Sequence, residues 1–137
     1  MKERIKEKID ELQQFLVELE EIVAQDFDEY IHDIKTKAAC ERYAEKIIES
    51  VIDVAMLIIK EKKLPQPESD LEAFSILQKE GIISSELSIK LQDAKRMRNI
   101  LVHEYGTVSD EIVFHAVSEE LPKDVTSFLA FVKRGEK

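Results

Sequence analysis

Apolar side chains recur at steps of three and four positions along the first part of the chain. Within residues 2–24 they form one stripe of an amphipathic helix, made of Ile5, Ile9, Leu12, Leu16, Leu19 and Val23. The 137-residue chain holds only three glycines and three prolines, and 36% of its residues are charged. This combination favours long helices over sheets. The sequence therefore predicts an all-α protein.

A second helix is expected over residues 26–62, with Asp26 as its N-cap. Its middle, IIESVIDVAMLII, is apolar on more than one side, so this helix should be the central and most buried one. Pro65 and Pro67 then end the helical pattern, because each lacks an amide donor and disfavours a helical residue before it.

Three further helices are expected after these prolines. Ser69 and Glu72 form a capping-box pattern before LEAFSILQKE, and Gly81 follows where a left-handed helix end is needed. The next helix should start at Ser84 or Ser85 and run to about Val102.

Gly106 lies just beyond that fourth helix. A fifth helix should begin near Ser109 and end before Gly135, with Pro122 kinking or splitting it. The prediction is an up-and-down bundle of about five helices, formed as a single domain by residues 1–137, a length typical of one domain.

Several classes of protein are excluded by composition. The start, MKERIKEKID, has scattered charges and no unbroken apolar run, so we expect neither a secretory signal nor a membrane anchor. The most apolar stretch, residues 47–59, is too short for a bilayer. Cys40 is the only cysteine, and we expect a buried or half-buried thiol rather than a disulfide or metal ligand. A soluble, cytoplasmic protein is the expectation.

The net charge of −9 argues against broad, non-specific binding of nucleic acids, which requires many Lys and Arg contacts to phosphates. The charge is unevenly distributed, however. Residues 87–105 contain four basic and two acidic side chains, a net charge of +2 that leaves −11 for the remainder. A polyanion can therefore be met locally by this segment.

Arg98 occupies a position that the helical pattern reserves for a buried side chain. It belongs to a stripe in which residues follow one another by four, three, four and three positions, made of Leu87, Leu91, Ala94, Arg98 and Leu101. A guanidinium in an apolar setting must meet a carboxylate or face a cleft that admits an anion. Asp53, an acid near the centre of the apolar second helix, is one candidate partner.

His103 lies on a different side of the same helix, together with Arg96 and Asn99. Arg98 should point about 140° away from it, at about 100° per residue. Two routes can bring the pair together. The helix can fray before His103, or a two-fold dimer can line one groove with the motif of each chain.

Such a pair suits phosphodiester transfer within RNA. An imidazole can take the proton from a 2′-hydroxyl and return one to the leaving oxygen, so His103 is the candidate general acid and base. The guanidinium of Arg98 stabilises the oxyanions, and Asn99 positions the substrate or His103. Neither role needs a metal or a cofactor, and we expect none.

Non-catalytic interpretations stay open at this point. A histidine at a helix end beside a surface ion pair complements the helix dipole, and Tyr105 alone would suggest a side chain that covers a helix end. Lys95 and Arg96 are more often part of a solvated face, although beside the motif they can contact RNA phosphates. The alternative function is a helical dimerisation or binding module that partners a nucleotidyltransferase without cutting RNA.

The run RNILVHEY resembles the HEPN superfamily, and within it the HepT-like toxin ribonucleases, which carry an Arg-x4-His-x-Tyr motif. It reads Arg98, His103 and Tyr105 here, with Asn99 at a place that is often polar in such families. The likeness extends to ERYAEKIIESVIDVAMLII, the proline-containing linker and FSILQKEGII.

That resemblance implies a homodimeric helical bundle in which two motifs form a composite cleft. It also implies metal-independent endoribonuclease activity within a toxin-antitoxin pair. The partner would be a minimal nucleotidyltransferase antitoxin of the MntA type, which neutralises the toxin by transferring AMP to the motif tyrosine, Tyr105 in this chain. A bulky anionic adduct there would repel substrate phosphate.

Overall fold

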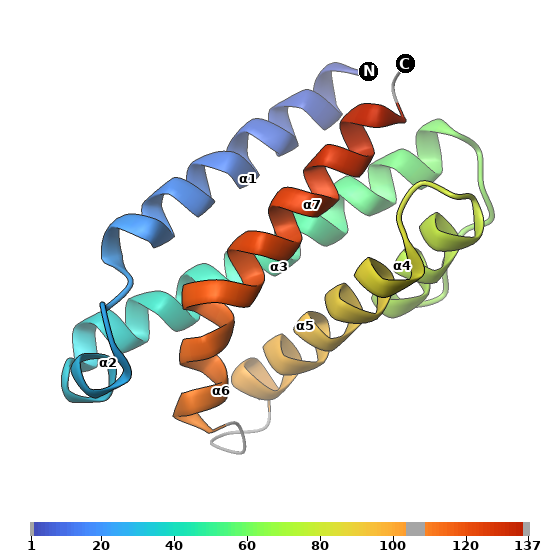
Figure 1. Cartoon of the computed structure of the whole chain (residues 1–137). Coiled ribbons are helices and arrows are strands. Elements are labelled where there is room, and N and C mark those ends of the chain that lie inside the picture. The colour runs from blue at the N-terminus through green and yellow to red at the C-terminus, as the bar shows by residue number, and fades with distance from the viewer. Residues whose placement is uncertain (1, 104–108, 136–137) are drawn as a thin grey trace.

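The computed structural model describes residues 2–103 and 109–135, and within these ranges it contains helices and no strand, which confirms the all-α prediction. Successive long helices run in opposite directions and lie side by side (Figure 1). The elements are α1 (Glu3–Ile22), α2 (Phe27–His32), α3 (Ile34–Glu61), α4 (Asp70–Lys79), α5 (Ser85–His103), α6 (Asp110–His115), a π-helical segment (Ala116–Glu120) and α7 (Leu121–Arg134).

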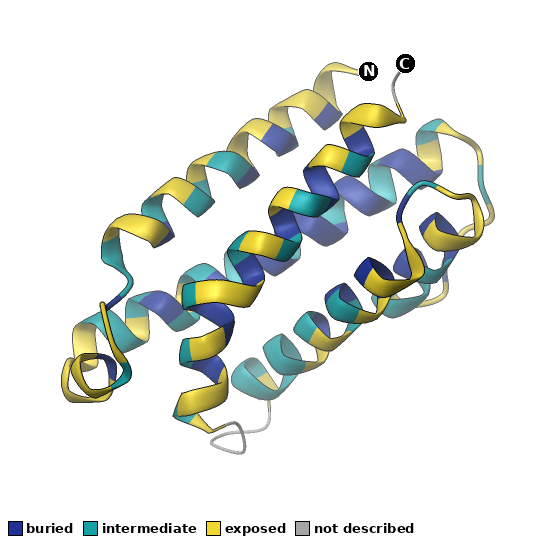
Figure 2. Ribbon diagram, viewed as in Figure 1, coloured by how far each residue is buried: buried dark blue, intermediate teal, exposed yellow. Residues whose placement is uncertain are grey.

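The centre of the bundle is α3, as its apolar pattern predicts. It packs against α1, α2, α4, α5 and the π-helical segment. Buried residues line its inward side over most of its length (Figure 2), among them Cys40, whose side chain is fully buried as expected. More of the surface of α3 is covered by neighbouring elements than is usual for a surface helix, so α3 forms the centre of the core. No helix within the described ranges is long and apolar enough to span a membrane.

The prediction of one helix over residues 26–62 is wrong in one respect, because the helix is interrupted at Asp33. Asp26 caps α2 by accepting the amide of Glu29 at 2.8 Å, as predicted. Asp33 then caps α3 by accepting the amide of Thr36 at 3.2 Å and its hydroxyl at 2.8 Å. Aspartate competes with the helical backbone for nearby amides, and this competition ends the first helix at His32 and starts a new one at Ile34.

The start and end of α4 follow the predicted pattern. Ser69 accepts the amide of Glu72 at 3.1 Å, and the Glu72 carboxylate accepts the amide of Glu68 at 3.2 Å rather than that of Ser69. Gly81 has a φ of +74°, the left-handed conformation expected of it. At the next helix, Ser84 is the residue that caps α5, because its hydroxyl accepts a first-turn amide at 3.1 Å.

The C-terminal helical region is continuous from Asp110 to Arg134 and does not split at Pro122. Instead, the π-helical segment immediately precedes the proline-containing first turn of α7. Proline has no amide to donate, and its ring clashes with the carbonyl four residues earlier in an α-helix. The wider π-turn accommodates that clash while keeping the chain helical.

Candidate active site

The candidate residues lie on the C-terminal half of α5, where the helix is less covered than at its start. Leu87 and Leu91 near its beginning are buried, and they anchor α5 to the core. From residue 97 to 102 every residue is only partly buried, and His103 at the end is exposed (Figure 2). The apolar first half therefore holds the helix in place while the second half leaves polar side chains accessible.

Arg98 faces the bundle and meets a carboxylate, as its place on the apolar stripe predicts. Its side chain is only 16% exposed, and Nη2 lies 2.8 Å from Oε1 of Glu49 on α3. Nη1 donates to Oδ1 of Asn99 at 3.3 Å. Nε is buried without a hydrogen-bond partner among the residues that the structure describes. The guanidinium is thus held along one edge and keeps further N–H groups for another acceptor.

The carboxylate that binds Arg98 is Glu49, and the suggestion of Asp53 is wrong. Asp53 lies one turn further along α3 and pairs with Lys8 of α1 at 3.2 Å. Both acids interrupt the same apolar run, so helical periodicity alone does not distinguish them. The position of α5 along the axis of α3 determines which acid lies next to Arg98, and this position is known only from the packed structure.

Lys95 and Arg96, adjacent in sequence, have opposite surroundings. Arg96 is exposed and pairs with Asp93 at 2.9 Å, so the interpretation as a solvated face is right for it. Lys95 is 6% exposed, and its Nζ lies 3.3 Å from Glu49 and 3.2 Å from Asp70, so that interpretation is wrong for Lys95. The ammonium of Lys95 is already engaged by two carboxylates within the protein.

His103 is the last residue of α5, and the helix persists to it. The frayed-helix route to convergence is therefore not what the chain adopts. Five residues of regular helix separate Arg98 from His103 by about 7.5 Å along the axis and about 140° around it. The positions of Tyr105 and Gly106, expected just beyond the helix, lie outside the described residues.

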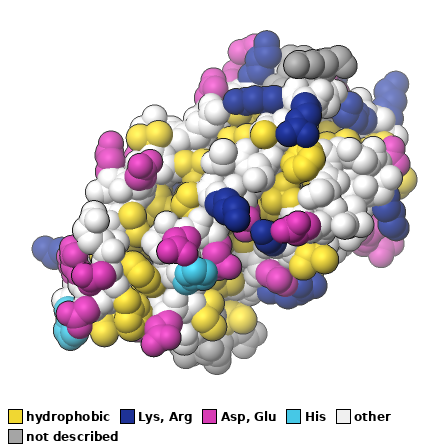
Figure 3. Space-filling model, in the orientation of Figure 1, with side chains coloured by type: hydrophobic (Ala, Val, Ile, Leu, Met, Phe, Trp, Pro, Cys, Tyr) yellow, Lys and Arg dark blue, Asp and Glu magenta, His cyan; other side chains and the backbone are white. Residues whose placement is uncertain are grey.

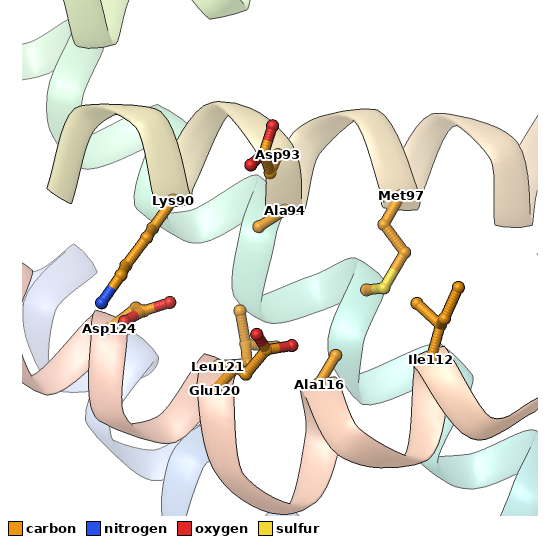
Figure 4. A pocket seen from close by; sticks show the side chains of 9 residues that line it. All are labelled: Lys90, Asp93, Ala94, Met97, Ile112, Ala116, Glu120, Leu121 and Asp124. Atoms are coloured by element: carbon orange, nitrogen blue, oxygen red, sulfur yellow. The ribbon is translucent and has the colours of Figure 1, made fainter. Parts of the chain in front are cut away.

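The groove between α5 and the region α6–α7 is a separate feature with a mixed lining (Figure 4). Its volume is about 180 Å³, and it is lined by Lys90, Asp93, Ala94, Met97, Ile112, Ala116, Glu120, Leu121 and Asp124. Three carboxylates and one ammonium make it a poor receptor for phosphate. Burial raises the pKa of Asp124 above its ordinary value.

Charges on the outer surface are mixed in the same way. Figure 3 shows acidic side chains around the end of the molecule formed by α2 and α6, next to apolar ones. In the part of the chain covered by the structure, no three His, Cys, Asp or Glu side chains gather as a metal site.

Comparisons with known proteins identify the family and the fold. The family described as ribonuclease HepT-like matches residues 5–132. The chain is 32% identical to the mRNA nuclease HepT of Shewanella oneidensis over 89 residues, which cover 65% of this chain and 66% of that protein. It is 27% identical to the tRNA nuclease HepT of Aphanizomenon flos-aquae over 114 residues, which cover 83% of this chain and 78% of that protein.

A solved structure shares the fold over nearly the whole chain. It is the tri-AMPylated HEPN toxin of Shewanella oneidensis in complex with an MNT antitoxin, similar with a TM-score of 0.90 and 25% identity over 98% of this chain and 99% of that one. The resemblance carried by RNILVHEY is thereby confirmed at the level of family and fold. The chain belongs to the HepT-like ribonuclease family.

Proposed function

We propose that this protein is the metal-independent endoribonuclease toxin of a toxin-antitoxin pair, and that it cuts RNA by attack of a 2′-hydroxyl. The observation that carries the proposal is that Arg98, on the partly exposed second half of α5, pairs with Glu49 through Nη2 and with Asn99 through Nη1, which leaves it further N–H donors among the residues that the structure describes. Membership of a ribonuclease family and likeness to two nucleases named HepT support the same activity.

Arg98 would bind the scissile phosphate and stabilise its developing charge. A guanidinium has five N–H donors, of which Glu49 and Asn99 accept two. Of the three that remain, Nε–H is buried, so the second N–H groups of Nη1 and Nη2 are the ones that would meet the non-bridging oxygens of a phosphorane. Those oxygens carry more negative charge in the transition state than in the ground state. Asn99, through its bond to Nη1, would help to orient the guanidinium or the substrate.

His103 would move the protons. In the first half of the step, an imidazole takes the 2′-hydroxyl proton as the 2′-oxygen bonds to phosphorus. In the second half, the bond from phosphorus to the 5′-oxygen breaks, and an imidazolium protonates that oxygen. The products are a 2′,3′-cyclic phosphate and a 5′-hydroxyl. Dependence on the 2′-hydroxyl restricts the substrate to RNA.

A homodimer would bring the two groups together. Since α5 stays helical to His103, one chain directs Arg98 and His103 to different sides, and a two-fold axis beside α5 would place His103 of each copy near the other's motif. Ile100 and Val102 remain partly exposed on the same turns, where a second copy would cover them. Two histidines in one cleft can also divide the acid and base roles.

We further propose that a nucleotidyltransferase antitoxin of the MntA type silences the enzyme by adding AMP to Tyr105. The Shewanella toxin of similar fold is tri-AMPylated and bound to an MNT antitoxin, which supports this regulation. Tyr105 is two residues from His103, so a nucleotide phosphate on its oxygen would compete with RNA for the cleft.

The activity test uses matched variants in a chelator. Wild type is expected to cut RNA, and Arg98→Ala and His103→Ala are expected to lose about a hundredfold or more in rate, the range typical of an oxyanion stabiliser and a general base. Arg42→Ala and His115→Ala remove an exposed residue of the same type away from the motif and should retain activity. Equal cutting by all five proteins would exclude the assignment.

The regulation test is an intact-mass measurement. Co-expression with the nucleotidyltransferase should add one or more AMP units to wild type and none to Tyr105→Phe. An unmodified wild-type protein, or the same adduct on Tyr105→Phe, would contradict the role of Tyr105.

A further inference from the structure

Four charged side chains from three helices form a chain of contacts that ends on Arg98, here called the ion chain. Asp70 of α4 contacts Lys95 of α5 at 3.2 Å, and Lys95 contacts Glu49 of α3 at 3.3 Å. Oε1 of Glu49 then contacts Nη2 of Arg98 at 2.8 Å. In order of contact the charges alternate in sign, beginning with a carboxylate and ending with the guanidinium.

We propose that Glu49 is a positioning residue for Arg98, fixing the guanidinium in the orientation in which its free N–H groups meet the RNA phosphate. This inference rests on the proposed function in assigning phosphate to Arg98. Glu49 does not itself touch the reacting atoms. Its role is to hold Nη2 of Arg98, so that the plane of the guanidinium and its free N–H groups keep one orientation.

The need for such a partner follows from the side chain of arginine. It has several rotatable bonds, and an unrestrained guanidinium near a surface samples many orientations, most of them unproductive for transfer of a phosphoryl group. Arg98 is confined because its side chain is only 16% exposed and two of its nitrogens already have acceptors. The shorter of these contacts, and the only one to a charged acceptor, is to Glu49.

Lys95 explains why Glu49 stays in place. Glu49 is itself 39% exposed and would rotate toward water if Arg98 were its only partner. The ammonium of Lys95 binds the same oxygen, Oε1, and has little freedom because its side chain is 8% exposed and also held by Asp70. Lys95 lies one turn before Arg98 on α5, so Glu49 is clamped between two cations of one helix face.

The ion chain also keeps Arg98 attractive to an anion. A lone Glu49–Arg98 pair would cancel the positive charge that phosphate binding requires. With Lys95 on the same carboxylate oxygen, the negative charge of Glu49 is shared between two cations, and Asp70 balances Lys95 at the end away from Arg98. The end of the chain that reaches Arg98 therefore remains positive.

The expected consequence separates positioning from binding. Glu49→Ala removes a negative charge beside Arg98, so RNA binding should stay equal or tighten, and KM should not rise. At the same time kcat should fall by about tenfold to a hundredfold, because the guanidinium is no longer held in register with the phosphate. If activity fell only because part of the protein were unfolded, the fraction of active enzyme would fall. The kcat and KM of the folded molecules would both stay as in wild type.

Single-turnover and steady-state cutting of a fluorescent RNA, corrected for folded fraction by thermal melts, test this directly. The matched control is Asp53→Ala, the same kind of change one turn along α3, which breaks the pair with Lys8 and should leave kcat and KM as in wild type. If Glu49→Ala fails to fold, Glu49→Gln replaces it, with a kcat expected between Glu49→Ala and wild type. Wild-type kcat in a folded Glu49 variant, or a raised KM at normal kcat, would overturn the proposal.

A second readout is independent of cutting. The guanidinium protons of Arg98 should give NMR signals slowed in exchange in wild type and in Asp53→Ala, and lost in the Glu49 variant. An unchanged spectrum would overturn the positioning role even where RNA is cut. A wild-type protein that shows these signals and cuts no RNA would refute the proposed function and leave the contact of Glu49 with Arg98 established.

Discussion

Replacement of Lys95 by methionine distinguishes a structural cation from an RNA contact. Lys95 makes two ionic contacts, at 3.3 Å to Glu49 and 3.2 Å to Asp70, and its own side chain is 8% exposed. Methionine keeps an unbranched apolar stem of similar length, so the packing made by the lysine methylenes is largely preserved. The change therefore removes mainly the charge and its hydrogen bonds.

The magnitude follows from the exposure of the partners. A hydrogen bond to a charged group contributes about 1.5–3 kcal/mol when fully buried, whereas exposed ion pairs contribute about 0.2–1 kcal/mol. Glu49 and Asp70 are 39% and 40% exposed, so water can replace part of each contact, and about 1 kcal/mol for each is reasonable. Lys95→Met should lower the free energy of unfolding by about 1–2 kcal/mol, or about 3–7 °C in Tm for a chain of this size.

Urea unfolding followed by circular dichroism measures this loss, with Lys8→Met as the control. Lys8 pairs with Asp53 at 3.2 Å and its side chain is 26% exposed, so its replacement should cost less than about 1 kcal/mol. RNA binding is measured in parallel over a range of salt concentrations in a His103→Ala background, which prevents cutting. Lys95→Met should lower the affinity, because Glu49 then neutralises Arg98 alone, but it should leave the salt dependence unchanged, because Lys95 itself contacts no phosphate.

Two results would refute this reasoning. Unchanged stability of Lys95→Met would mean that the ion chain contributes nothing to folding. A weaker affinity with a salt slope reduced by about one would mean that Lys95 contacts a phosphate directly.

Three other predictions concern the fold. Burial raises the pKa of the Cys40 thiol to about 11, so Ellman's reagent at pH 8 should label it only after unfolding, and rapid labelling of the native protein would contradict its burial. Burial raises the pKa of Asp124, which makes its ionised form unfavourable in the folded state. Asp124→Asn should therefore stabilise the protein at pH 7, and the gain should vanish as the pH falls below the ordinary pKa of aspartate. A loss of stability at pH 7 would show that the electrostatic attraction of Lys90 outweighs the cost of burial. Gly81→Ala should cost about 1 kcal/mol in chemical denaturation, because φ is +74° although nothing lies within 4 Å of an added Cβ, and an equally stable variant would show that the backbone relaxes there.

The helices could be predicted because their causes are local. Apolar spacing on one stripe sets the face of α1 that is buried, and side chains such as Asp26 and Ser69 cap amides only three residues away. Where two local preferences compete, sequence spacing alone does not decide which structure forms. The helical pattern across Asp33 and the capping ability of its carboxylate point to different structures, and the cap prevails. At Pro122, a π-helical turn keeps the chain helical, so the split that the sequence also allowed does not occur.

The candidate site divides in the same way. Sequence by itself determined that Arg98 lies on the inward stripe of its helix and must either find a carboxylate or face a cleft that admits an anion. Both statements follow from spacing along one helix and from the cost of an unpaired charge. Only the tertiary structure decided that the carboxylate is Glu49 rather than Asp53, and that Lys95 is buried between two acids while Arg96 beside it is solvated. Those choices depend on how far α5 is shifted and rotated against α3 and α4, which is set by the packing of the whole core and by no local pattern.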